Sequence, residues 1–185
     1  MKRAISIIMM AVIMSPVLAL AEGLPLFFFD KTEDFKAVSS GLDPWVFPCE
    51  LTKEHVVSGN ALKVIPKKGG KWVVFKSPQT DWSSYDYLKI ECFNPGKRTT
   101  IYLCIADAQA LPCTEEYAWS GYPIARQKTV LSRGQQTIQF PVKKLATIDS
   151  RPMNMKDVKL FGLGFDEDDR EFVINNIRLE REEEQ

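Results

Sequence analysis

The sequence predicts an all-β domain built as a β-sandwich of about ten strands. Many segments of five to nine residues are rich in Val, Ile, Phe, Tyr and Thr and are separated by turn residues. No segment keeps apolar residues at helical spacing for longer than about two turns. Turns such as Ser58-Gly-Asn, Lys68-Gly-Gly, Asn94-Pro-Gly and Arg133-Gly either supply a positive φ or remove a ladder donor.

The expected strands follow one another without a linker or an internal repeat, which favours one domain. They cover residues 26–30, 46–51, 61–65, 72–76, 87–93, 100–106, 129–131, 135–140, 158–165 and 172–180. Only residues 142–148 have the pattern of a helical turn.

Alternation assigns the faces of two strands. Leu88, Ile90 and Cys92 share one side of the strand over 87–93. The strand over 100–106 is apolar on both sides, which is typical of a strand in the interior of its sheet.

The first 21 residues are predicted to be a cleaved signal peptide. Lys2 and Arg3 precede an apolar run of about 16 residues that ends at Ala19-Leu20-Ala21. A membrane anchor is the competing interpretation, but a spanning helix needs roughly 20 apolar residues. Residues 22–185 would then form the secreted or periplasmic domain, with no membrane span and a short acidic C-terminal tail.

The charge balance argues against a nucleic-acid partner. Of 24 basic residues the signal peptide carries two, so 22 basic residues remain against 24 acidic ones. Binding a phosphate backbone requires a concentrated positive surface. The sequence therefore favours other classes of partner.

Four cysteines remain in the exported part, and an even number there permits disulfides. Cys104 and Cys113 form the first candidate pair, because they bracket a loop that contains Pro112. Alternatively, Cys92 and Cys104 are small buried side chains in apolar strands.

The order of four segments carries a family resemblance. They are Tyr85-Asp-Tyr-Leu-Lys-Ile-Glu-Cys-Phe-Asn-Pro-Gly, Thr100-Ile-Tyr-Leu-Cys-Ile-Ala-Asp, Gly134-Gln-Gln-Thr-Ile-Gln-Phe-Pro-Val and Phe172-Val-Ile-Asn-Asn-Ile-Arg-Leu-Glu. This order resembles the carbohydrate-binding-module-like, or galactose-binding-like, jelly-roll domains of bacterial carbohydrate-active enzymes. The resemblance implies a jelly-roll β-sandwich of two antiparallel sheets and a non-catalytic domain that contacts a polysaccharide or other glycan.

An aromatic segment supplies the candidate glycan-binding residues. They are Tyr117, Trp119, Tyr122 and Arg126, together with Asp107 at the end of the preceding strand, and Trp45 as a second-rank candidate. Aromatic rings stack on the C–H faces of sugars, and Arg or Asp can bond to the hydroxyl groups. The alternative is that these rings cap an open edge of the sandwich core. Trp72 and Trp82 are expected in the core.

The resemblance also implies a structural calcium site that ties the two ends of the domain together. The matching positions are Asp30, the Ser58-Gly59-Asn60 turn and Asn175. Asn175 replaces the aspartate of the family pattern, and a hard cation favours carboxylates, so a weak or absent site is also consistent with the sequence.

Two other functions remain open. One is an interaction protein of the envelope that binds a protein partner through the sandwich surface. The other is a small glycan-active enzyme, which would need two carboxylates facing each other across a cleft. His55 is the single histidine and lies in a polar stretch, and the chain contains no nucleophile turn or phosphate-binding glycine loop. The sequence therefore favours binding over catalysis.

Overall fold

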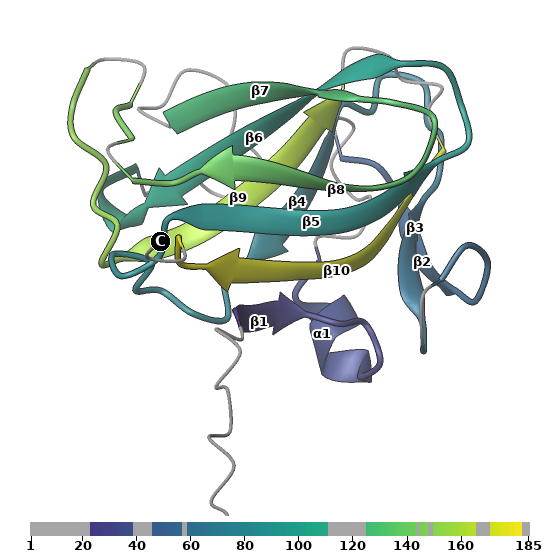
Figure 1. The fold of residues 1–185 in the computed structure, drawn as a ribbon, viewed down its shortest axis with the longest axis horizontal. Coiled ribbons are helices and arrows are strands. Elements are labelled where there is room, and N and C mark those ends of the chain that lie inside the picture. Colours follow the sequence, from purple (N-terminus) through teal and green to yellow (C-terminus); the bar gives the residue numbers. More distant parts are fainter. Residues whose placement is uncertain are drawn as a thin grey trace, which may run out of the picture.

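A computed structural model describes residues 23–38, 46–56, 59–110, 125–143, 145–147, 150–165 and 171–182. Within these ranges the chain forms ten strands arranged as two antiparallel sheets that face each other (Figure 1). The predicted β-sandwich is therefore confirmed. In the described part of the chain no helix has the length and apolar character needed to cross a membrane.

The larger sheet has six strands in the order β2-β3-β10-β5-β8, with β1 also paired to β10. Its strands are β1 (Leu24–Phe27), β2 (Cys49–Thr52), β3 (Ala61–Val64), β5 (Tyr87–Asn94), β8 (Gly134–Pro141) and β10 (Phe172–Glu180). The smaller sheet has the order β4-β9-β6-β7. Its strands are β4 (Trp72–Lys76), β6 (Thr99–Asp107), β7 (Ala125–Leu131) and β9 (Val158–Phe165).

The core lies between the two sheets, where the inward-facing members of each alternating strand meet. Leu88, Ile90 and Cys92 of β5 are all buried in it, as their alternation predicted. β6 lies between β9 and β7, which confirms its interior position in the sheet. Trp82 is fully buried, and its indole N–H donates to the carbonyl oxygen of Gln79 at 2.7 Å.

The first and last residues of several strands were predicted correctly. The bounds predicted for β4, β9 and β10 are those observed. β7 was predicted too short, because its outward Arg126 and Lys128 interrupt the apolar pattern.

The helical turn predicted over residues 142–148 is wrong for the part that the structure describes. There the chain is non-helical, and Ala146 forms an isolated antiparallel bridge with Pro152. The helix that does form, α1 (Thr32–Lys36), follows β1, and Asp34 stabilises this turn because its carboxylate accepts the N–H groups of Phe28 and Phe29 at 3.1 Å.

Candidate functional site

The side chains on the outer face of the four-stranded sheet form the candidate site. In each strand they alternate with residues that enter the core, such as Ile101, Leu103 and Phe161. The outward set is Trp72, Val74 and Lys76 on β4; Leu160, Gly162 and Gly164 on β9; Thr100, Tyr102, Cys104 and Ala106 on β6; Arg126, Lys128 and Val130 on β7. We call this set the β4–β7 face.

Strand register places four of these residues in one row across the sheet. Trp72 pairs with Gly164, Gly164 pairs with Tyr102, and Tyr102 pairs with Lys128. Two aromatic rings thus flank a glycine, with a cation at the end of the row. Arg126 belongs to the neighbouring row, opposite Cys104.

Gly164 is what allows the Trp72 ring to lie over the middle of the sheet. A Cβ atom on Gly164 would lie 2.2 Å from Cζ3 of Trp72, so no larger residue leaves the ring in its place. Glycine inside a strand weakens pairing, and it often marks a position where another group approaches the backbone closely. Here that group is an indole ring.

Arg126 extends from β7 toward the same ring. Its Cζ lies 5.8 Å from the centroid of Trp72, the geometry of a cation–π contact. Arg126 also hydrogen-bonds with the thiol of Cys104. Burial raises the pKa of that thiol to about 11, although the Arg126 charge acts in the opposite direction. Trp72, Arg126 and Cys104 thus form one connected layer on the sheet.

The core position predicted for Trp72 is wrong. Its side chain is only partly buried and lies on the β4–β7 face. Alternation with the inward Val73 and Phe75 contained this signal, since residue 72 must then face the same way as Val74. Tyr102 and Lys128 were missed for a related reason, because their pairing with Trp72 through Gly164 depends on a strand order that sequence reasoning did not supply.

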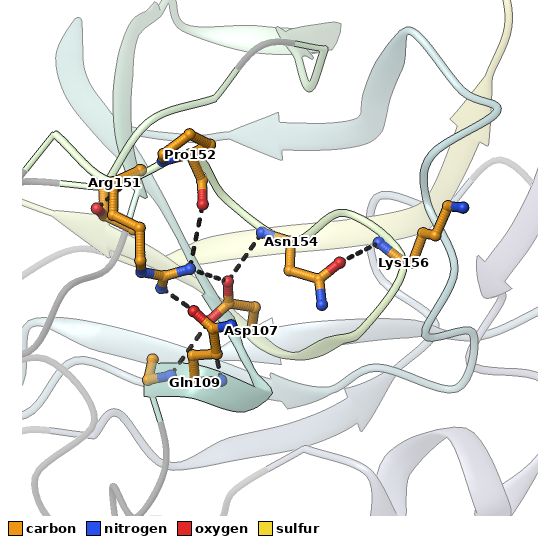
Figure 2. A network of polar contacts seen from close by, with 8 residues as sticks. Asp107, Gln109, Arg151, Pro152, Asn154 and Lys156 are labelled. Carbon is orange, nitrogen blue, oxygen red and sulfur yellow. Dashed lines mark hydrogen bonds and ion pairs between the residues drawn. The ribbon is translucent and has the colours of Figure 1, made fainter.

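Asp107 lies at the end of β6 in a dense polar network (Figure 2). Its carboxylate is fully buried and accepts two hydrogen bonds from the Arg151 guanidinium, at 2.7 and 3.0 Å. It also accepts the backbone N–H groups of Gln109 and Ala110 at 3.1 Å and that of Asn154 at 2.8 Å. The network therefore fixes the chain after β6 to the segment before β9.

The charge of Asp107 is stabilised within this network. Burial alone would raise the pKa of Asp107, but the hydrogen bonds from Arg151, Asn154 and Ala110 and the Arg151 charge outweigh it and hold the pKa below the ordinary value of 3.8. Both carboxylate oxygens are engaged by donors of the chain itself. The structure thus assigns Asp107 a positioning role at the end of the sheet.

The predicted aromatic residues Tyr117, Trp119, Tyr122 and Trp45 lie outside the described residues, as does Cys113. Of the predicted glycan contacts, Arg126 lies on the β4–β7 face, while Asp107 lies in the buried network at the end of β6.

The cysteines that the structure describes carry free thiols. They are Cys49, Cys92 and Cys104, so the structure has no bridge at Cys104. Cys92 and Cys104 are buried, in agreement with the alternative interpretation of small apolar side chains.

Two of the residues expected to bind calcium are in contact. Oδ1 of Asp30 accepts the N–H of Asn60 at 3.0 Å, and Gly59 at φ +67° packs directly on that carboxylate. Asn175 is buried at a bulge of β10, next to Ile174, which pairs with Leu62. Asp30 supplies the one carboxylate among these residues, whereas Ca²⁺ takes six to eight oxygen ligands, so the calcium site stays a prediction. No group of three or more His, Cys, Asp or Glu residues suited to a metal occurs in the described ranges.

The outer face of the six-stranded sheet is chemically different. Its charges are largely paired with one another: Arg178 with Glu91 at 2.6 Å and with Glu180 at 2.5 Å, and Lys89 with Glu180. His55 stacks on Phe93 with the ring centroids 3.8 Å apart. On this face the charges of β5 and β10 are paired with one another, and the His55 ring covers that of Phe93.

The sequence matches no family model and no curated protein. Solved structures with the same fold include the family 11 carbohydrate-binding module from Clostridium thermocellum in complex with a β-1,3-1,4-mixed-linked tetrasaccharide, with a TM-score of 0.55, 15% identity, and coverage of 80% of this chain and 85% of that chain. The solution structure of CtCBM11 gives a TM-score of 0.65 at 16% identity, covering 90% and 100% of the two chains. A non-crystalline cellulose-specific module, CBM28, gives 0.54 at 12% identity, covering 85% and 93%. The domain thus has the fold of carbohydrate-binding modules.

Proposed function

We propose that this protein is an exported, non-catalytic domain that binds a poly- or oligosaccharide on its β4–β7 face. The observation that carries the proposal is the Trp72 ring seated over Gly164, with Tyr102 on the neighbouring strand and Arg126 beside the ring. The fold shared with carbohydrate-binding modules supports it.

The chemistry of the face matches that of a sugar. The C–H groups on one side of a pyranose ring pack on an aromatic ring, while its hydroxyl groups need fixed polar partners at the edge. Trp72 and Tyr102 supply the rings, and Arg126 and Lys128 supply donors. The face is partly buried: Val74, Cys104 and Leu160 on it are inaccessible, whereas Arg126 and Lys128 are exposed. A polar site of this kind binds with affinities on the order of micromolar to millimolar.

Two features of the sequence extend the proposal to export and to further aromatic residues. Residues 1–21 have the composition of a signal peptide. The segment before β7 carries Tyr117, Trp119 and Tyr122, and the chain enters β7 at Ala125, next to Arg126. We keep these three residues as candidate glycan contacts.

The non-catalytic part of the proposal depends on charge. Glycoside hydrolysis uses a pair of carboxylates on either side of the scissile bond. Among the described residues that point outward on the β4–β7 face there is no Asp or Glu. Asp107, the nearest carboxylate along β6, is engaged by Arg151.

A protein partner has less support. A docking surface for a protein would gather apolar side chains in one patch. The large hydrophobic side chains that the described residues expose are Phe28, Leu51 and Val130, and they belong to three different parts of the fold.

The proposal is tested by a polysaccharide panel in affinity gel electrophoresis, run on the purified protein with Ca²⁺ and with chelator. Retardation by at least one polysaccharide is expected, and Tyr102→Ala should lower the affinity about tenfold through loss of a stacking ring, roughly 1.4 kcal/mol. Phe93→Ala is the matched control, because it removes a ring from the opposite sheet.

Three outcomes of the panel decide the assignments. No retardation by any polysaccharide would contradict the proposed function. Equal losses in both variants would contradict the assignment to the β4–β7 face. The chelator arm tests the calcium interpretation: with the donor set described above, binding and melting temperature should not change when calcium is removed.

A further inference from the structure

We propose that the glycan held on the β4–β7 face is anionic, carrying carboxylate or sulfate groups; this inference rests on the proposed function. The described outward side chains of the face include three cations, Lys76, Arg126 and Lys128, and no carboxylate. The whole chain has equal numbers of basic and acidic residues, so this local excess is not a consequence of composition.

The cations lie beside the aromatic rings. Arg126 and Lys128 alternate on β7, so their Cα atoms are about 7 Å apart and their side chains leave the same side of the strand. Lys128 is paired with Tyr102, and Arg126 reaches the Trp72 ring. A sugar stacked on either ring therefore has a cation within reach of its substituents.

On the outer face of the six-stranded sheet, by contrast, two cations are held in ion pairs. There Lys89 and Arg178 each form an ion pair with Glu180, and Arg178 also pairs with Glu91. Arg126 and Lys128 are exposed instead, and the contacts that the structure gives Arg126 are an aromatic ring and a thiol. Their charge is thus directed at the surface on which the sugar would lie.

An anionic ligand would interact favourably with both Arg126 and Lys128. A guanidinium group can donate two parallel hydrogen bonds to a carboxylate or sulfate, and an ammonium group adds a point charge. A surface of one sign also attracts a polyanion from a distance, in a salt-dependent manner. A neutral glycan would gain only ordinary hydrogen bonds from the same side chains.

The test compares charged polysaccharides with uncharged ones of related composition, by isothermal titration calorimetry. One pair is polygalacturonate and its highly methyl-esterified form, and the other is carrageenan and neutral agarose. At least one anionic member should bind about tenfold or more tightly than its neutral partner at 50 mM salt, and the difference should shrink at 500 mM salt because the charges are screened. The pair that shows the preference distinguishes carboxylate from sulfate.

A charge variant assigns the preference to the face. Lys128→Gln should weaken binding of the preferred polyanion about two- to fivefold, the usual range for an exposed ion pair, with no change for a neutral glycan. Lys53→Gln removes the same charge from the loop after β2 on the other sheet and should have no effect.

The outcomes separate this inference from the proposed function. Equal affinity within both pairs, together with loss of binding in Tyr102→Ala, would overturn the anionic ligand and leave the proposed function in place. Failure to bind any polysaccharide would overturn both. Binding of inorganic polyphosphate that survives Tyr102→Ala would also overturn the inference, since the face would then act as a general ion exchanger.

Discussion

Replacing Trp72 with alanine is expected to weaken polysaccharide binding about thirtyfold or more. Aromatic residues at the centre of a binding surface typically contribute at least about 2 kcal/mol, which corresponds to that factor. Trp72 is the largest side chain on the β4–β7 face and has a glycine beneath it. Isothermal titration calorimetry against the best ligand of the panel measures the change.

Two further variants show whether the loss of affinity in Trp72→Ala comes from the position of the Trp72 ring. Phe28→Ala removes a ring that is 49% exposed at the end of β1, away from the face, and should leave affinity unchanged. Gly164→Ala keeps Trp72 but forces its ring to move, because the new methyl group would be 2.2 Å from Cζ3. It should weaken binding several-fold and change the near-UV circular dichroism of the indole. Unchanged affinity in both Trp72→Ala and Gly164→Ala would exclude the ring from the site.

Replacing Asp107 with asparagine is expected to lower the free energy of unfolding by about 3 kcal/mol. Removing one partner of a buried ion pair costs about 3–5 kcal/mol, and the lower end applies here because the Arg151 side chain is 25% exposed and can be solvated. Urea denaturation measures the loss. Asp157→Asn is the matched control, since its ion pair with Lys159 is partly exposed and contributes at most about 1 kcal/mol.

The same pair of proteins has a defined pH dependence. The pKa of Asp107 is lowered in the folded state, so its charge stabilises the fold fully above the unfolded value of about 3.8 and loses that effect as the pH falls through the folded value. The stability difference between wild type and Asp107→Asn should therefore be constant near neutral pH and shrink in strong acid. A difference that grows on acidification would contradict the network.

Much of the fold could be predicted because local chemistry and packing point to the same structure. In β9 and β10 almost every residue that faces the core is apolar, so the limits of the strands coincide with the limits of the pattern. At β7 the inward Gln127 and Thr129 are polar or half-buried, and propensity alone did not mark the start of the strand. α1 has no buried residue, so its sequence lacks the apolar pattern from which a helix is predicted.

The candidate site was predicted less well because it is assembled from strands far apart in the sequence. Trp72, Tyr102 and Arg126 meet only because β9 inserts between β4 and β6. The ion pair of Asp107 joins residues 44 positions apart, and neither partner shows a local signal of the other. Arg126 was found from its aromatic neighbours in sequence, whereas the ring that it contacts in the described structure is Trp72.

The most direct test of the central claim is an amide chemical-shift titration of the ¹⁵N-labelled protein with the best polysaccharide or its oligosaccharide. We expect the largest shifts on β4, β6, β7 and β9, including the indole N–H of Trp72, while the amide signals of β2, β3, β5 and β10 remain in place. Shifts confined to the six-stranded sheet, or no shifts at saturating glycan, would contradict binding on the β4–β7 face.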